Sequence, residues 1–356
     1  MTTADRTSES WTRFELSHRQ EADGPPEARG LARDGVRLLV SDREKLEHSV
    51  FRDLPRFLRA GDLLVVNTSA TLPAAVDAEI DGAGPVVVHF STPLGPSPWG
   101  GQDWAVEVRG PGPVTGPLSW IGVGSRIRLP RNVFVMLLEP WPSGSRRLWR
   151  ARVEGVADVE SDLLAAAGRP ITYAYVSGRW PLSYYQTVFG RVPGSAEMPS
   201  AGRPFTDRLV TELVTGSVSL APVLLHTAVS SPEAGEPPMP ERYAVSAHTA
   251  RVVNETRAAG GRVIAVGTTV TRALEASATA DGRAVADAGW TDLVLGPGRP
   301  ARVVDGLVTG WHAPGASHLM LLEAVVGAAV VRRAYEAALT HGYLWHEFGD
   351  SALLLR

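Results

Sequence analysis

The stretch RVIAVGTTVTRALE, residues 262–275, constrains the fold of this chain more than any other. Residues 263–266 form a short apolar run rich in β-branched side chains, which is typical of a strand buried on both faces. Gly267, Thr268 and Thr269 break this run, and a helical pattern follows. The free backbone N–H groups at the start of such a helix, with two hydroxyls beside them, suit a phosphate, a carboxylate or a ribose oxygen. In the alternative interpretation Gly267 is only a turn and the threonines only cap the helix.

The remaining patterns predict two domains, as the length of 356 residues suggests. Residues 61–155 contain short β-type runs separated by turns rich in Gly, Pro and Ser, which predicts a small β-barrel or sandwich. On both sides of this segment helical and strand patterns alternate, which predicts an α/β layer with a largely parallel sheet. We therefore expect an α/β domain from residues 13–60 and 156–356, an all-β domain inserted at 61–155, and a disordered tail at 1–12. The expected elements include a short helix at 51–58, a strand at 291–295, a hairpin of 302–305 with 307–309, and a long helix at 317–339.

Composition excludes several kinds of chemistry. The chain has no cysteine, so disulfides, zinc–thiolate sites, iron–sulfur clusters and thiol nucleophiles are absent. Lys45 is the only lysine and therefore the only candidate for Schiff-base chemistry. A net charge of −3 argues against general coating of nucleic acid but allows a local basic patch. The longest apolar stretch, residues 319–331, contains Glu323 and is too short to span a bilayer. We expect a cytoplasmic protein with no membrane and no disulfide-linked partner.

Two regions outside the central stretch carry candidate chemistry. Tyr185 and Gln186 lie in a long loop at residues 170–205, and an aromatic ring beside an amide suits stacking on a base and reading its edge. A packed surface loop is the alternative. His312 follows a predicted strand, where open α/β sheets bind ligands, and it is a candidate general base or acid, or else a structural histidine. Asp350 can place a carboxylate beside it or form a turn.

Arginines are concentrated in the last predicted strands of the β segment. They form a candidate patch for phosphate or RNA, although a solvated strand face is an equally good interpretation. The residues are Arg126, Arg128, Arg131, Arg146, Arg147, Arg150 and Arg152. The histidines show no paired spacing such as H-E-x-x-H, so no metal site is expected.

Short phrases in a fixed order extend over nearly the whole chain. They are GDLLVVN (61–67), YQTV (185–188), AG (201–202), LH (225–226), the stretch 262–275, GWTD (289–292), VVD (303–305), WHAP (311–314) and FGD (348–350). Together they resemble the S-adenosylmethionine:tRNA ribosyltransferase-isomerase family of queuosine biosynthesis. The resemblance implies an α/β domain with an inserted β-barrel. It also implies that S-adenosylmethionine acts as a ribosyl donor, without a metal, and that the acceptor is the aminomethyl group of a deazaguanine in tRNA. Adenine and methionine leave, and an epoxycyclopentane forms.

The resemblance also suggests roles for individual residues. His312 and Asp350 are the candidates for proton transfer, and Arg272 is the third catalytic candidate. The expected substrate-binding residues are Gly267, Thr268, Thr269, Tyr185, Gln186, Ala201, Gly202, Asn67 and His226.

The chain departs from the family pattern at several positions. Ala70 and Ala75 stand where the family carries arginines, and Pro204 stands where it carries a histidine. The glycine-rich phrase after His226 is replaced, and an M-H-S-E phrase is reduced to MPER at 239–242. Two alternatives follow: ribosyl transfer or cleavage with a small-molecule acceptor, or a non-catalytic paralogue that binds a nucleoside or RNA. If Thr268, Arg272, His312 and Asp350 share one cleft, catalysis is favoured; if His312 and Asp350 point apart, binding alone is favoured.

Overall fold

The computed structural model describes residues 12–43, 45–98, 100–112, 116–230 and 238–356. The predicted disordered tail therefore lies outside the described residues, with the exception of its last member. Thr12 is buried, and both its backbone N–H and its hydroxyl donate to Glu323 Oε1, at 2.8 and 2.7 Å.

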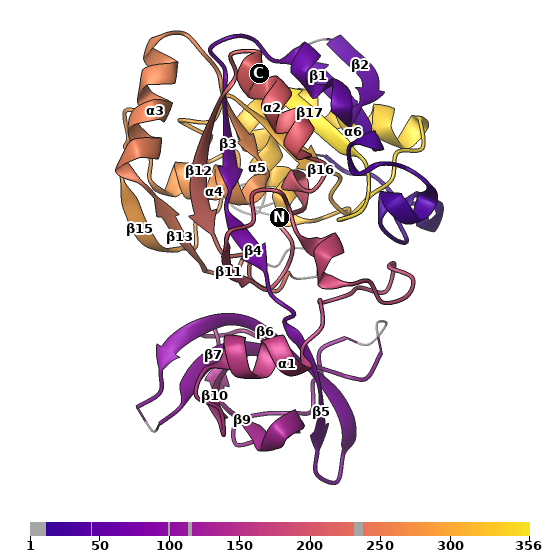
Figure 1. Ribbon diagram of the computed structural model, residues 1–356, viewed down its shortest axis with the longest axis vertical. Helices are drawn as coiled ribbons and strands as arrows, with labels where there is room; N and C mark the ends of the chain where they lie inside the picture. Colours follow the sequence, from indigo (N-terminus) through magenta and orange to yellow (C-terminus); the bar gives the residue numbers. More distant parts are fainter. Residues whose placement is uncertain (1–11, 44, 99, 113–115, 231–237) are drawn as a thin grey trace, which may run out of the picture.

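Within the described residues, a nine-stranded sheet forms the main domain, in the order β15-β13-β12-β3-β14-β16-β17-β1-β2 (Figure 1). Its middle strands β12, β3, β14 and β16 are parallel, as the alternating pattern predicts. The strands are β1 (Arg37–Asp42), β2 (Lys45–Val50), β3 (Leu63–Asn67), β12 (Ser219–Leu225), β13 (Glu241–Val245), β14 (Val263–Val266), β15 (Asp287–Thr291), β16 (Gly306–Gly310) and β17 (Ser351–Leu355). β4 (Ser69–Thr71) and β11 (Val192–Ser195) form a separate parallel pair.

Helices cover both faces of the main sheet because successive strand residues point to opposite sides. Val263 and Ala265 of β14 pack toward α3 (Ala247–Ala258), α4 (Thr268–Ala276), α5 (Ser317–Val326) and α6 (Ala328–Thr340). Ile264 and Val266 pack toward α2 (Asp207–Thr215) and the 3-10 helix η5 (Phe51–Phe57). The expected helix at 51–58 is thus a 3-10 helix. The expected long helix at 317–339 is interrupted at Gly327, where φ is 87°.

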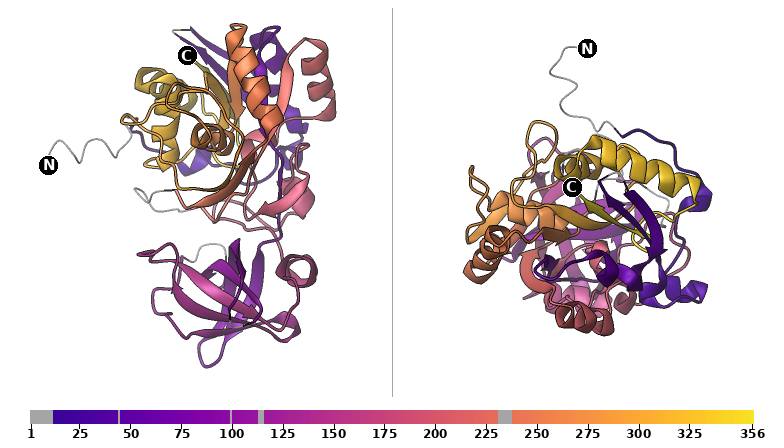
Figure 2. Two further views of the ribbon diagram at one scale, coloured as in Figure 1. Left: turned by 90° about the vertical axis from the view of Figure 1, so that its left-hand side faces the viewer. Right: turned by 90° about the horizontal axis from the view of Figure 1, so that it is seen from above.

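The inserted domain is a closed antiparallel barrel with the strand order β10-β7-β6-β5-β8-β9. Its strands are β5 (Ala75–Ile80), β6 (Gly84–Pro96), β7 (Gln102–Arg109), β8 (Arg126–Leu129), β9 (Val133–Pro140) and β10 (Leu148–Glu154). The barrel forms a separate lobe at one end of the molecule (Figure 2). A π-helix (Val159–Leu164) and the short α1 (Ala165–Ala167) follow it. The fold class is confirmed, but the barrel begins after residue 61, because β3 lies between β12 and β14 in the main sheet.

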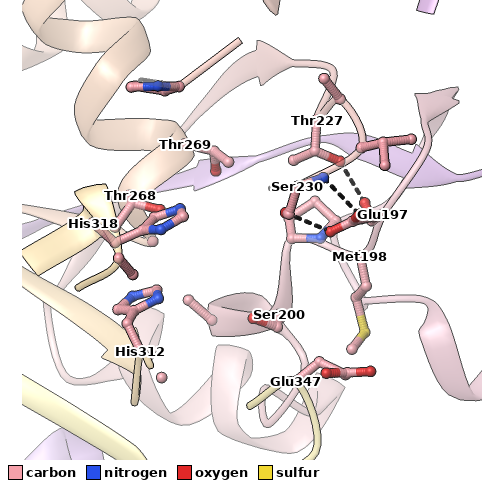
Figure 3. A pocket seen from close by; sticks show the side chains of 18 of the residues that line it. Glu197, Met198, Ser200, Thr227, Ser230, Thr268, Thr269, His312, His318 and Glu347 are labelled. Carbon is pink, nitrogen blue, oxygen red and sulfur yellow. Dashed lines mark hydrogen bonds between the residues drawn. The ribbon is translucent and has the colours of Figure 1, made fainter. Parts of the chain in front are cut away.

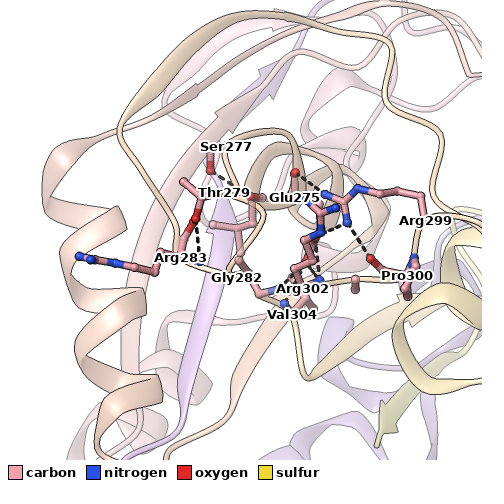
Figure 4. Close-up of polar contacts among 12 residues, drawn as sticks. Glu275, Ser277, Thr279, Gly282, Arg283, Arg299, Pro300, Arg302 and Val304 are labelled. Carbon is pink, nitrogen blue, oxygen red and sulfur yellow. Dashed lines mark hydrogen bonds and ion pairs between the residues drawn. The ribbon is translucent and has the colours of Figure 1, made fainter.

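Two local predictions near the site are wrong. Residues 302–305 form no strand, because the backbone N–H groups of Arg302, Val303 and Val304 donate to the carboxylate of Glu275 on α4 (Figure 4). The strand expected at 291–295 lies earlier, in β15, where the pairing with β13 ends at Thr291.

Acidic neighbours neutralise much of the predicted arginine patch on the barrel. Arg147 is buried and pairs with Glu107 at 3.0 Å, and Arg150 pairs with Asp103 at 2.6 Å. Arg128 and Arg152 also have carboxylate partners, in Glu79 and Glu154. Since ion-paired arginines present less net charge to a phosphate, the solvated strand face describes Arg128, Arg150 and Arg152 better, whereas Arg147 is buried.

Candidate functional site

A cavity of about 400 Å³ lies at the carboxyl ends of β14 and β16. Its walls come from the start of α4, from residues 170–175 and 196–201, from the loop after β12, and from residues 311–318 and 346–347. Arg147 of the barrel also lines it, so both domains contribute to its surface. A position at the carboxyl ends of parallel strands is where open α/β sheets bind their ligands.

The start of α4 presents free donors to this cavity. Gly267 lies between β14 and α4 with φ of 98°, and a Cβ atom there would come within 3.2 Å of Ala201 Cβ. Among the described residues, no side chain caps this helix. Thr268 and Thr269 line the cavity, so their hydroxyls and the unpaired N–H groups of the first turn suit an anionic or hydroxyl-bearing ligand.

His312 is held rigidly at the edge of the cavity. Its backbone N–H donates to Tyr335 Oη at 3.2 Å, and its carbonyl accepts from Trp345 Nε1 at 3.0 Å. Its Nε2 lies 3.0 Å from Thr309 Oγ1, and the Thr309 hydroxyl donates to the carbonyl of Gly310. Because that hydroxyl has one proton to give, the arrangement favours a proton on His312 Nε2 and leaves Nδ1 as an acceptor.

His318 on α5 stacks on His312, with ring centroids 4.5 Å apart and an interplanar angle of 1°. Burial lowers the pKa of both imidazoles, to about 4 for His318 and well below the ordinary value for His312. His318 further disfavours charge on His312, Arg272 further disfavours charge on His318, and both imidazoles are neutral near pH 7. Two neutral imidazoles in one cavity can accept protons.

Two carboxylates lie across the cavity from the histidines (Figure 3). Glu197 accepts hydrogen bonds from the hydroxyl of Tyr173 and from the backbone N–H and hydroxyl of Ser230, the latter two at 2.7 and 2.6 Å. Glu347 accepts from the hydroxyl of Tyr175 at 2.7 Å. Burial raises the pKa of both carboxyls, to about 7 for Glu347, so burial outweighs the donors that stabilise the charged form.

Arg272 lines the cavity but its donors are committed to the protein. It forms an ion pair with Glu241 and donates to the carbonyls of Met239, Thr291 and Leu293 at 3.1 to 3.2 Å. Burial raises the pKa of Glu241, and the charge of Arg272 acts in the opposite direction. Arg272 therefore fixes the wall of the cavity.

The structure brings together part of the predicted site. The predicted residues that line the cavity are Tyr185, Ala201, Gly267, Thr268, Thr269, Arg272 and His312. Asp350 lies outside it, so the expected placement of this carboxylate beside His312 is corrected. Its oxygens accept from the backbone N–H and the guanidinium of Arg37 at 2.8 to 3.0 Å, and from the N–H of Leu344 at 2.8 Å. β1 runs parallel to β17, and this pairing places Arg37 beside Asp350.

Four other predicted residues do not line the cavity. Asn67 binds the backbone of Leu225 through both amide atoms and donates to Thr269 Oγ1 at 3.4 Å. Gln186 binds the backbone of Thr71, so its amide is not free to read a base. The Nδ1 atom of His226 lies 2.8 Å from Ser69 Oγ. Gly202 packs against the side chain of Thr187.

Two of the departures from the family pattern contribute to the cavity, and the others lie outside its lining. Pro204 is buried, and its neighbour Arg203 binds Glu27 at 2.8 Å. Glu241, from the MPER phrase, is the partner of Arg272. In the replaced segment after His226, Thr227 and Ser230 line the cavity. Ala70 and Ala75, where arginines are expected, lie in β4 and β5.

Sequence reasoning missed several side chains that line the cavity: Tyr173, Tyr175, Glu197, Ser230, His318 and Glu347. The spacing of Tyr173 and Tyr175 in the long loop was the only available signal, because residues two apart in an extended chain face the same side. The two carboxylates come from segments far apart in sequence and share no motif.

The described residues contain no group of three or more His, Asp or Glu side chains placed to hold a metal ion. In the same part of the chain, no helix is long and apolar enough to cross a bilayer.

The chain is similar to proteins of queuosine synthesis along almost its full length. The family model described as queuosine biosynthesis protein matches residues 10–354. The S-adenosylmethionine:tRNA ribosyltransferase-isomerase of Moorella thermoacetica is 35% identical, with 96% of this chain and 98% of the relative covered. Relatives of the same name from Desulfitobacterium hafniense and Thermus thermophilus are 32% and 34% identical, and 98% and 93% of their lengths are covered.

The same similarity is present in three dimensions. The crystal structure of an S-adenosylmethionine tRNA ribosyltransferase from Thermotoga maritima matches with a TM-score of 0.53 and 26% identity. The match covers 97% of this chain and 99% of that one, so it includes both the sheet domain and the barrel.

Proposed function

The chain belongs to the queuosine biosynthesis protein family, and on that premise we propose that it is an S-adenosylmethionine:tRNA ribosyltransferase-isomerase. The observation that carries the proposal is the nearly full-length similarity to relatives with this name, 35% identical in the case of Moorella thermoacetica. In the reaction that the resemblance implies, the ribosyl part of S-adenosylmethionine is transferred to an aminomethyl group on a deazaguanine of tRNA. Adenine and methionine are released.

The start of α4 suits the donor substrate. The amino-acid part of S-adenosylmethionine carries a carboxylate, and the ribose carries hydroxyls. Free N–H groups at a helix start favour the carboxylate, and the hydroxyls of Thr268 and Thr269 can bind either group. We therefore assign these two residues and Gly267 to donor binding.

His312 is the proposed general base. A proton beside the sulfonium must be removed, and a neutral imidazole with a free nitrogen at the cavity edge can accept it. Thr309 orients the ring, and burial keeps it uncharged before the reaction. Tyr185 and Ala201 complete the wall near the transferred group.

The two rival functions receive less support. The relatives compared above do not support a small-molecule acceptor, because their names specify tRNA. A non-catalytic paralogue was favoured if His312 and Asp350 point apart, and Asp350 does lie outside the cavity. However, Thr268, Arg272 and His312 do share one cavity. Glu347 and His318 also line this cavity, so groups that can transfer protons are present there without Asp350. A cytoplasmic location stays a prediction.

Product release tests the proposed function directly. The purified protein is incubated with S-adenosylmethionine, with and without tRNA that carries the deazaguanine precursor, and adenine and methionine are followed by mass-resolved chromatography. Release that depends on this tRNA is the expected result. Release without tRNA would indicate a small acceptor or water, and binding without any release would indicate the non-catalytic paralogue.

A further inference from the structure

The carboxylates of Glu197 and Glu347 are not needed by the donor chemistry described above. Both side chains line the cavity and both are partly open to it. Their hydrogen-bond donors are hydroxyls and one backbone N–H. Among the described residues, neither carboxylate has an arginine or lysine within ion-pair distance, whereas Glu241 pairs with Arg272 and Arg147 with Glu107.

Aromatic rings fix these carboxylates in place. Tyr173 and Tyr175, which donate to Glu197 and Glu347, are stacked with centroids 5.8 Å apart. Tyr175 also stacks on His346 at 3.8 Å. Neither carboxylate is paired with a cation, and repulsion by the charge of Glu197 adds to burial in raising the pKa of the Glu347 carboxyl. A bound cation would relieve this repulsion.

A second feature indicates that the cavity is built for a ligand. Trp311 lines it and is 2% exposed, yet its indole N–H has no acceptor among the described residues. A buried N–H without a partner is unfavourable, so a ligand or water must complete its hydrogen bonding.

On the basis of the proposed function, we propose that Glu197 and Glu347 bind the protonated aminomethyl group of the acceptor, a primary ammonium, and that Glu347 then takes its proton. The ammonium loses one proton to the Glu347 carboxylate, which becomes a neutral carboxylic acid. The amine that results has a free lone pair and can form a bond to the ribosyl carbon that bears adenine, while the bond from that carbon to adenine breaks and adenine leaves. An ammonium ion has no lone pair, so the reaction requires such a proton acceptor.

S-Adenosylmethionine also carries a primary ammonium, on its methionine part, but geometry favours the acceptor. In an α-amino acid the ammonium and the carboxylate are attached to the same carbon. If the start of α4 binds the carboxylate, the ammonium must lie on that side too. Glu197 and Glu347 lie on the opposite side of the cavity from Thr268 and Thr269 (Figure 3).

Calorimetry with two free bases tests the ammonium site without requiring turnover. One probe is 7-aminomethyl-7-deazaguanine and the other is 7-methyl-7-deazaguanine, which lacks the amine. The wild-type protein should bind the amine at least about tenfold more tightly, as expected for charge-assisted hydrogen bonds. Glu197→Gln and Glu347→Gln should lose this preference while their affinity for the methyl base is unchanged, which also shows that they are folded. Glu255→Gln removes one carboxylate charge in the same way, but at an exposed position on α3. This control variant should keep the preference for the amine.

The two sources of the ammonium are separated by a third ligand. S-Adenosylhomocysteine keeps the amino-acid ammonium, so its affinity should be the same in wild type and both variants. Weaker binding of this ligand by the variants, together with an unchanged amine preference, would assign the carboxylates to the donor and overturn the proposal. A wild-type protein with no amine preference would overturn it as well.

Kinetics separate the failure of this inference from the failure of the proposed function. Glu347→Gln should lower kcat by about 10² or more because a proton acceptor is lost. Glu197→Gln should mainly raise KM for tRNA. If the wild type is active and Glu347→Gln retains its kcat, only the proton-transfer role is wrong. If the wild type prefers the amine but releases no adenine, the proposed function fails and the ammonium site stands.

Discussion

Replacing Glu275 with alanine should strongly destabilise the sheet domain. This carboxylate is 1% exposed, and it accepts hydrogen bonds from the backbone N–H groups of Arg302, Val303 and Val304 at 2.8 to 3.1 Å (Figure 4). Arg299 adds an ion pair at 3.4 Å. The bonded segment leads directly into β16, which carries Thr309 and ends beside His312.

The expected magnitude follows from the number of bonds that are lost. Hydrogen bonds to a charged acceptor contribute roughly 1.5 kcal/mol each at the lower end of their range, so three of them give a loss of roughly 4.5 kcal/mol in unfolding free energy. Glu275→Gln keeps one carbonyl oxygen for Val303 and Val304 and should cost only about 1 to 2 kcal/mol. Arg299→Ala removes a partly exposed pair and should cost less than about 1 kcal/mol.

Urea unfolding monitored by tryptophan fluorescence measures these differences, and hydrogen exchange of residues 299–310 locates them. Glu255→Gln on the exposed face of α3 is the control and should stay within about 0.5 kcal/mol of wild type. The segment should exchange faster in Glu275→Ala and only slightly faster in Glu275→Gln. A Glu275→Ala protein within about 1 kcal/mol of wild type, with unchanged exchange in this segment, would refute the reasoning.

Three further predictions concern single residues. His312→Gln should lower kcat by about 10² to 10⁴ while S-adenosylmethionine still binds by calorimetry; a kcat within about tenfold of wild type would exclude this histidine as the base. Arg272→Met should lower the free energy of unfolding in urea by at least about 3 kcal/mol, because Glu241 loses its ion-pair partner. Adding Glu241→Gln should recover part of this loss, and no recovery would argue against the ion pair. Burial alone would raise the pKa of Glu107, but contact with His89 and two arginines lowers it to about 2. The ionised Glu107 carboxylate therefore stabilises the folded protein fully above its unfolded pKa, and this stabilisation is lost as the pH falls toward 2. Glu107→Gln should accordingly flatten the curve of unfolding free energy against pH between about 4.5 and 2. An unchanged acid limb would contradict this.

The local sequence determined the elements that position the site. Residues 263–266 are buried throughout, Gly267 adopts the positive φ that the turn requires, and α4 begins at Thr268. These features depend on neighbours along the chain, so a pattern of apolar residues and a glycine is sufficient to predict them. The expectation that His312 follows a strand is confirmed for the same reason, since β16 ends at Gly310.

The sequence could not assign strands to their sheets. Leu63–Asn67 has the short apolar pattern of a barrel strand, yet it pairs with β12 and β14 in the main sheet. A strand pattern indicates that a segment is buried and extended. It does not identify the strands that pair with this segment, because they lie far away in the sequence. The segment at 302–304 follows the same rule, since the Glu275 carboxylate that it binds lies on a helix distant in the sequence.

The sequence by itself thus determined the family, the alternation of strands and helices, and the placement of Thr268 and His312 at the end of the sheet. Only the tertiary structure decided which side chains share the cavity. It placed Asp350 against Arg37 and put Glu197 and Glu347 across from His312. Protonation was likewise decided there, because burial and neighbouring charges set a pKa, and both arise from contacts between segments that are distant in the chain.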